Sequence, residues 1–214
     1  MVYLIVCDHV AAQTYPVGSG LDDPQNATQR EFRKLLIKTI ENYDPTLIAE
    51  EYDPYILKNQ GRQSVALEVA TERHVCHRFC EPSLSDRREL GIDEDLPFLG
   101  PLTLGEWFDR IETEQEAFRH DFAHRWPVRE EFWIKRLGDD IHKKVLFICG
   151  AGHRETLRRR LESRGIKVKI IEKRFGASKM RESHFAAYRD VRRNGFPPVT
   201  DGSDSRCFCT KPLD

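Results

Sequence analysis

The sequence predicts an α/β fold with a mostly parallel sheet, helices on both faces and a helical insertion. Continuous apolar runs at residues 2–6, 46–49 and 144–149 are typical of strands that are covered on both faces. Helical spacing of apolar residues lies between the first two runs, which is the pattern of a strand–helix–strand crossover. With 214 residues and 39% hydrophobic side chains, the chain is long enough for one packed domain.

The helices and the third strand of the first half of the chain have weaker sequence signals than the three apolar strands. A capping box between Thr28 and Glu31 predicts the start of a helix, because its hydroxyl and carboxylate satisfy free backbone amides. Pro45 ends that helix. A weaker helical pattern covers residues 62–73, and residues 75–80 are expected to form a short third strand.

The second half begins with an aromatic-rich helical insertion at about 103–138. A second capping box between Thr103 and Glu106 opens it, and Trp126-Pro127 interrupts it. The later predicted elements are a helix, a strand and a terminal helix, at residues 153–164, 166–171 and 185–191. We expect one domain over residues 1–193 and a loop-like tail over 194–214, where glycine and proline replace apolar residues.

The cysteines and the hydropathy indicate the compartment. The six cysteines are scattered, which favours free thiols in a reducing environment over a disulfide framework. No apolar run approaches the roughly 20 residues of a membrane helix, and the opening segment lacks the features of a signal peptide. We therefore expect a cytoplasmic protein without a membrane span. The potential metal ligands His74, Cys76, His77 and Cys80 match no standard zinc spacing.

Charge is unevenly distributed along the chain. The formal net charge is −1, yet residues 151–200 carry 14 Lys and Arg against 5 Asp and Glu, a balance of +9. Such a region can bind nucleic acid or another anion, or it can be a solvated helix surface. Arg158, Arg159 and Arg160 lie on one helical turn and cannot all face one side, so we interpret them first as surface residues.

Polar side chains follow each predicted strand at the point where the strand ends. Because ligands bind beyond the carboxyl ends of parallel strands, these residues are the candidates for a site. They are His9, the adjacent pair Glu50 and Glu51, Glu81, and His153 within Gly150-Ala-Gly-His153.

Two kinds of chemistry fit two histidines and two glutamates. His9, Glu50, Glu51 and His153 could hold a divalent metal such as Zn, Mn or Fe. Alternatively, a histidine could take a proton from water while carboxylates fix its tautomer. If the strand continues through Glu50 and Glu51, these two side chains point to opposite faces, so only one of them reaches the site directly.

The turn after the fourth strand is the candidate substrate-binding element. Gly150 and Gly152 allow a tight strand-to-helix turn, whose amides can approach an oxyanion or a phosphate. We include Arg154 with them as a substrate-binding residue. The turn lacks the third glycine of a dinucleotide fingerprint.

These residues resemble the TraB/TIKI, ChaN and erythromycin-esterase superfamily, which carries two Gly-x-x-His motifs with a glutamate between them. Gly150-Ala-Gly-His153 matches the second motif, and Val6-Cys-Asp-His9 lies in the place of the first, with valine for its glycine. Glu51 and Glu50 stand where the glutamate is expected, and Arg87 aligns with an intervening polar residue. The resemblance spans residues 1–175 in order and spacing.

The resemblance implies metal-dependent peptide cleavage, ester hydrolysis or haem-related iron handling, depending on the branch. We predict a hydrolase, metal-dependent in the first instance, that cleaves an ester, amide or peptide bond of a small-molecule or peptide substrate. His9, Glu50, Glu51 and His153 would activate water, and Arg87 would stabilise negative charge in the transition state. The alternative is a non-enzymatic module that binds a nucleotide or nucleic acid through residues 150–160 and the basic C-terminal third.

Overall fold

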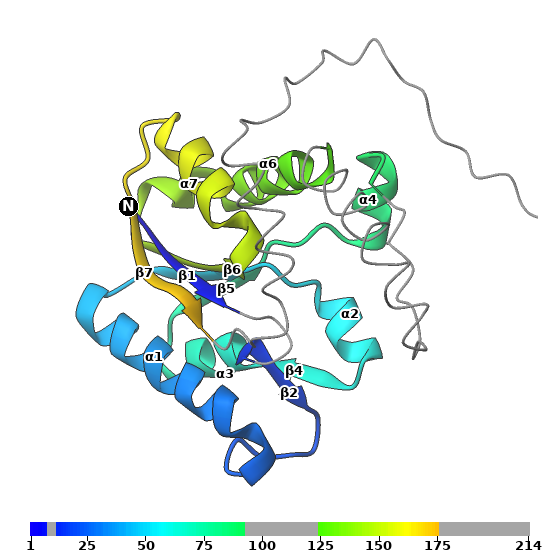
Figure 1. The fold of residues 1–214 in the computed structure, drawn as a ribbon, viewed down its shortest axis with the longest axis vertical. Helices are drawn as coiled ribbons and strands as arrows, with labels where there is room; N and C mark the ends of the chain where they lie inside the picture. The colour runs from blue at the N-terminus through cyan, green and yellow to red at the C-terminus, as the bar shows by residue number, and fades with distance from the viewer. Residues whose placement is uncertain (8–11, 93–123, 176–214) are drawn as a thin grey trace, which may run out of the picture.

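The computed structural model describes residues 1–7, 12–92 and 124–175 (Figure 1). These residues form a parallel five-stranded sheet of order β5-β3-β6-β1-β7 and a separate antiparallel ladder of β2 with β4. The strands are β1 (Val2–Cys7), β2 (Thr14–Pro16), β3 (Leu47–Glu50), β4 (Arg62–Ser64), β5 (Cys76–Phe79), β6 (Val145–Gly150) and β7 (Val168–Phe175). The predicted α/β class with a mostly parallel sheet is confirmed.

The helices cover both faces of the sheet, as the sequence predicts. They are α1 (Ala27–Tyr43), α2 (Pro54–Asn59), α3 (Val65–Glu72), α4 (Leu84–Glu89), α6 (Trp126–Leu137) and α7 (Arg154–Glu162). Apolar side chains of α1 and α3 pack on one face of the sheet, and those of α6 and α7 pack on the other. Figure 1 shows these layers on either side of the central strands.

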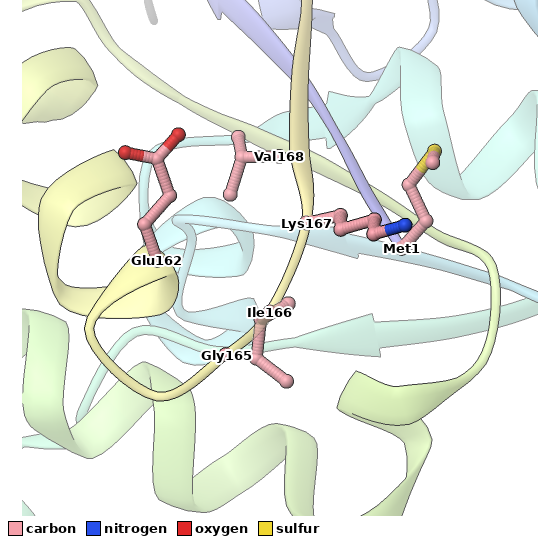
Figure 2. A pocket seen from close by; sticks show the side chains of 6 residues that line it. All are labelled: Met1, Glu162, Gly165, Ile166, Lys167 and Val168. Carbon is pink, nitrogen blue, oxygen red and sulfur yellow. The ribbon is translucent and has the colours of Figure 1, made fainter.

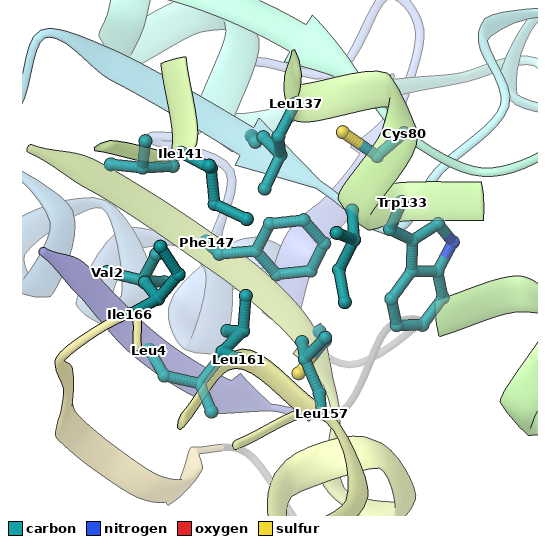
Figure 3. Packing of buried hydrophobic residues seen from close by; sticks show 14 of the residues in the cluster. Val2, Leu4, Cys80, Trp133, Leu137, Ile141, Phe147, Leu157, Leu161 and Ile166 are labelled. Atoms are coloured by element: carbon teal, nitrogen blue, oxygen red, sulfur yellow. The ribbon is translucent and has the colours of Figure 1, made fainter. Parts of the chain in front are cut away.

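The core on the α6 and α7 face forms around Phe147 of β6 (Figure 3). Leu157 and Leu161 of α7 reach it from one helix, and Trp133 of α6 lies with its ring centroid 5.6 Å from that of Phe147. Burial of such large side chains stabilises the fold, and truncating one to Ala costs about 3–5 kcal/mol. The same packing fixes α6 against the sheet close to the end of β6.

The order of the strands creates a topological switch point between β3 and β6, where the connections after the two strands run to opposite faces of the sheet. These neighbours pair in parallel. After β3 the chain continues through β4 to α3 on one face, whereas after β6 it enters α7 on the opposite face. Between such strands the connections diverge and leave space for a ligand at the carboxyl edge. The predicted strand–helix–strand unit of β1, α1 and β3 is present, and β6 lies between its two parallel strands.

Local sequence misleads at three places. Asp23 caps a 3-10 turn and α1 begins at Ala27, so Thr28 lies inside the helix and the predicted capping box is wrong. Residues 62–64 form a strand rather than the first turn of a helix, because Arg62 binds Thr14 across the ladder. The sequence gives no signal for the short elements β2, α2 and α4.

Several predictions lie outside the described residues. These are the capping box of Thr103, the terminal helix near 185–191, the tail from 194 and the site residue His9. Trp126 and Pro127, where the sequence predicts an interruption, form the first turn of α6. Proline is accepted there because the first turn of a helix needs no amide donor from it.

We predict that the thiols react according to their burial. Cys76 on edge strand β5 is exposed, whereas Cys7, Cys80 and Cys149 are buried. Burial raises the pKa of Cys80 to about 12 and that of Cys149 well above its usual range. Iodoacetamide at pH 7.5 should therefore modify Cys76 at least about tenfold faster than the buried thiols, as measured by peptide mass spectrometry. In urea all should react alike; fast labelling of native Cys149 would contradict the packing.

Candidate active site

Glu51 and His153, two of the predicted site residues, meet at the switch point. The backbone amide of Gly150, the last residue of β6, donates to Glu51 Oε2 at 2.8 Å. The amide of Glu51 donates in turn to the carbonyl of Ile148 at 3.0 Å, so the end of β3 is joined to β6. Glu51 Oε1 lies 3.5 Å from Nε2 of His153, and both side chains are 4% exposed.

Arg129 of α6 lies between the carboxylates of this edge. Its Nη2 donates to Glu51 Oε1 at 2.5 Å and to Glu81 Oε2 at 3.0 Å, and its Nε donates to Glu81 Oε1 at 2.9 Å. The guanidinium also stacks over Trp133, 5.4 Å from the ring centroid. Such fork-shaped pairing uses the planar geometry of arginine and orients Glu51 and Glu81 together.

Glu130, the next residue of α6, holds His153 from the other side. Its fully buried carboxylate lies 2.9 Å from His153 Nδ1 and also accepts from the Thr156 hydroxyl and, at 2.9 Å, from Arg160 Nε. An ionised carboxylate can only accept hydrogen bonds, so Nδ1 carries the proton. The lone pair of neutral His153 is then on Nε2, which lies 3.5 Å from Arg129 Nη1. That distance is too long for a strong hydrogen bond, so Nε2 remains able to accept a proton.

Two tryptophans enclose the imidazole of His153. The ring centroids of Trp126 and Trp133 lie 4.3 Å and 4.7 Å from that of His153. The Trp133 indole also donates to Glu81 Oε2 at 3.1 Å, which ties the aromatic residues to the carboxylates. Trp126 lies so close to Gly152 that a Cβ atom there would meet the indole within 2.8 Å. This close approach explains the second glycine of the turn.

Among the described residues, the charges of this cluster balance. The carboxylates of Glu51, Glu81 and Glu130 are matched by three guanidinium groups, those of Arg87, Arg129 and Arg160. Buried charges need such partners because desolvation is costly.

The predicted residue Arg87 reaches the cluster through Glu81. Its Nη2 donates to Glu81 Oε1 at 3.1 Å and its Nε to the carbonyl of Pro82 at 3.2 Å. A capping box of Ser83 and Asp86 begins α4, which carries Arg87. Hydrogen bonds from the Ser83 hydroxyl and amide lower the pKa of Asp86. Arg87 therefore supports a site carboxylate and has no direct hydrogen bond to His153 in the described structure.

Glu50 points to the other face of the sheet, as strand alternation predicts for adjacent residues. Its Oε1 accepts from the Ser64 hydroxyl at 2.6 Å and lies 2.8 Å from Nε2 of His77 on β5. The sequence groups Glu50 with His153, but the described contacts of Glu50 are those with Ser64 and His77. Glu51 is the member of the pair that reaches His153.

Within the described part of the basic segment, three arginines of α7 form ion pairs. Arg154 lies 3.3 Å from Glu155, Arg158 pairs with Glu155 and Glu162, and Arg160 with Glu130. These arginines are therefore already paired with carboxylates, whereas a nucleic-acid-binding protein would need them to bind phosphate groups. Arg154, predicted to bind substrate, is placed on α7 beside Glu155 rather than with Glu51.

The residues at the switch point do not fit a bound divalent metal. Arg129 already supplies the positive charge between Glu51 and Glu81, and its Nη1 lies 3.5 Å from Nε2 of His153. In the part of the chain that the structure describes, no three or more His, Cys, Asp or Glu side chains are arranged so that they could hold a metal ion. His9, the remaining predicted ligand, lies outside that part.

Helix α6 contributes site residues that the sequence pattern does not reveal. Trp126, Glu130, Trp133 and Leu137 are buried on one face of this helix, with Arg129 beside them. A charged residue on an otherwise apolar helical stripe was the available signal, because a buried charge requires partners. Glu81 appears in the sequence among the strand ends but not among the predicted catalytic residues, although it binds both Arg87 and Arg129.

A surface hollow of about 490 Å³ lies at the opposite edge of the sheet (Figure 2). It is lined by Met1, Glu162, Gly165, Ile166, Lys167 and Val168. Met1 and Val168 stand at the amino-terminal ends of β1 and β7, whereas the cluster around His153 lies at the carboxyl ends. The hollow is therefore separate from the candidate active site.

No protein-family model, curated protein or solved structure matches the chain. The resemblance to the TraB/TIKI, ChaN and erythromycin-esterase superfamily consequently stays a prediction. In the described ranges, no helix combines the length and the apolar character that crossing a bilayer requires.

We predict that Gly152→Ala destabilises the protein through Trp126. The new Cβ would overlap the indole, and relief of such overpacking costs about 1–3 kcal/mol. Urea denaturation measures the loss. Gly20→Ala is the matched control, because its Cβ would meet only an amide nitrogen at an ordinary 3.8 Å. Adding Trp126→Phe should restore part of the stability; equal stabilities of the two alanine variants would contradict the packing.

We also predict that adjacent arginines of α7 differ sharply in their effect on stability. Arg160→Ala removes a cation from fully buried Glu130 and should cost about 1–3 kcal/mol of the free energy of unfolding. Arg159 is exposed, so Arg159→Ala should change stability by less than about 0.5 kcal/mol. Thermal and urea denaturation compare them, and a reversed order would show that Glu130 does not depend on Arg160.

Proposed function

We propose that the protein is a hydrolase that cleaves an ester or amide bond of a small-molecule or peptide substrate, with His153 as the general base. The observation that carries this proposal is the geometry of the imidazole. Glu130 accepts a hydrogen bond from the Nδ1–H group, and Nε2 is turned towards Glu51 and Arg129 at the switch point of the sheet. A histidine held in this way can accept a proton from water.

The proposed reaction needs one water molecule and no other reactant. His153 Nε2 takes a proton from water while the water oxygen bonds to the carbonyl carbon, and the carbonyl electron pair moves to its oxygen. The resulting oxyanion is stabilised by the guanidinium of Arg129. When the carbon–oxygen or carbon–nitrogen bond breaks, the leaving alcohol or amine takes the proton from His153. The products are a carboxylic acid and that alcohol or amine.

The carboxylates around Arg129 and His153 have orienting roles in this proposal. Glu51 and Glu81 fix the guanidinium of Arg129, and Glu130 stabilises the imidazolium that forms when His153 accepts the proton. His153 is only 3% exposed, which favours a slender acyl group over a bulky one. The free thiols of the described cysteines agree with the cytoplasmic location that we propose from the sequence.

The hydrolase proposal is tested with a series of p-nitrophenyl esters and p-nitroanilides of short acyl groups. We expect kcat/KM of His153→Ala to fall about 10²–10⁴-fold, because general-base catalysis contributes that much. His142→Ala is the matched control. His142 is exposed and lies before β6, so this substitution should remove only the non-specific hydrolysis that a surface imidazole contributes. Activity should survive exhaustive chelation. A folded His153→Ala protein with wild-type activity would refute the proposal.

A further inference from the structure

We infer that the guanidinium of Arg129 occupies the place where a divalent metal would bind, so that the cation of this site belongs to the chain itself. Glu51, Glu81 and His153 are residue types that ligate metals. Arg129 donates to both carboxylates and lies 3.5 Å from the imidazole Nε2. The inference concerns the site of the proposed function but does not require hydrolysis.

The hydrogen bonds show that Arg129 already binds both of the carboxylates that a metal would need. Both oxygens of Glu81 and one oxygen of Glu51 accept from its guanidinium, and the second Glu51 oxygen accepts from the amide of Gly150. A metal bound to these oxygens would have to displace the guanidinium. Arginine remains charged at all relevant pH values, so it cannot make room by losing a proton.

The charge balance leads to the same conclusion. Within the described cluster, three glutamates face three arginines, and the sum is neutral. Adding a divalent cation would leave a buried excess of two positive charges, which desolvation makes unfavourable. Removing the charge of Arg129 would leave one uncompensated negative charge beside an imidazole, which is a composition that attracts a divalent cation.

Arg129 also cannot be moved aside at little cost. It lies over Trp133, which is fully buried in the core that joins α6 to the sheet. Trp133 itself donates to Glu81, so the aromatic ring and the guanidinium position the same carboxylate. The packing that holds α6 in place thereby holds the cation in place.

The test is a metal titration of the purified full chain. Calorimetry measures the binding affinity, and thermal denaturation measures the change in melting temperature. Neither Mn²⁺ nor Zn²⁺ should bind the wild-type protein at this site. Arg129→Ala should gain a site for one Mn²⁺ or Zn²⁺ ion with at least tenfold higher affinity than any wild-type binding. A hundredfold excess of metal over its dissociation constant should raise the melting temperature of this variant by about 5 °C.

Two control variants make the gain specific. Arg129→Lys keeps the positive charge and should gain no metal binding. Adding Glu51→Gln to Arg129→Ala removes a ligand and should abolish the gain. Neither comparison requires a substrate, so the inference is tested even in a protein without hydrolytic activity.

Two outcomes would overturn the inference. One is stoichiometric metal binding by the wild-type protein that Glu51→Gln or His153→Ala abolishes. The other is a folded Arg129→Ala protein that binds no more metal than the wild type. If Arg129→Ala folds only when Mn²⁺ or Zn²⁺ is supplied, the inference is supported. If Arg129→Ala folds neither with nor without metal, the titration of the wild-type protein decides: stoichiometric binding at this site overturns the inference, and no binding supports it.

Discussion

The guanidinium of Arg129 is the interaction on which this end of the molecule depends. β3 and β5 deliver Glu51 and Glu81 to the carboxyl edge of the sheet, where both side chains are buried. Two buried carboxylates repel each other unless a cation lies between them. Arg129 provides that cation, and its helix α6 is held by the same contacts that neutralise the sheet edge.

Because α6 is fixed in this way, the neighbouring residue Glu130 is fixed as well. Consecutive residues on a helix point about 100° apart, so Arg129 can face the strand-end carboxylates while Glu130 faces α7. There it accepts from His153, Thr156 and Arg160. One helix thus neutralises the acidic edge and sets the tautomer of the histidine. These are the two conditions for the proposed base to act without an external cation.

Glu50 and Glu51 show which features of the site follow from the geometry of a single strand and which do not. Alternation along a strand places Glu50 and Glu51 on opposite faces, and the structure bears this out. Alternation does not say which of the two faces holds His153. That depends on α7, which follows β6 and packs on the same face as α6. Glu50 instead lies with Ser64 and His77 on the face of α1 and α3.

The sequence by itself determined the parallel sheet, its apolar strands and the set of polar residues at their carboxyl ends. These follow from short-range patterns, because runs of apolar residues form buried strands wherever they pair. Only the tertiary structure decided that β6 lies between β1 and β3, and that Glu51 binds Arg129, which is 78 residues away. Hydrogen bonds between charged residues that are distant in the sequence depend on how the helices pack across the sheet. The sequence does not show which charged side chains will be buried together, away from solvent. The pairing of charges that defines this site is therefore a property of the packed fold.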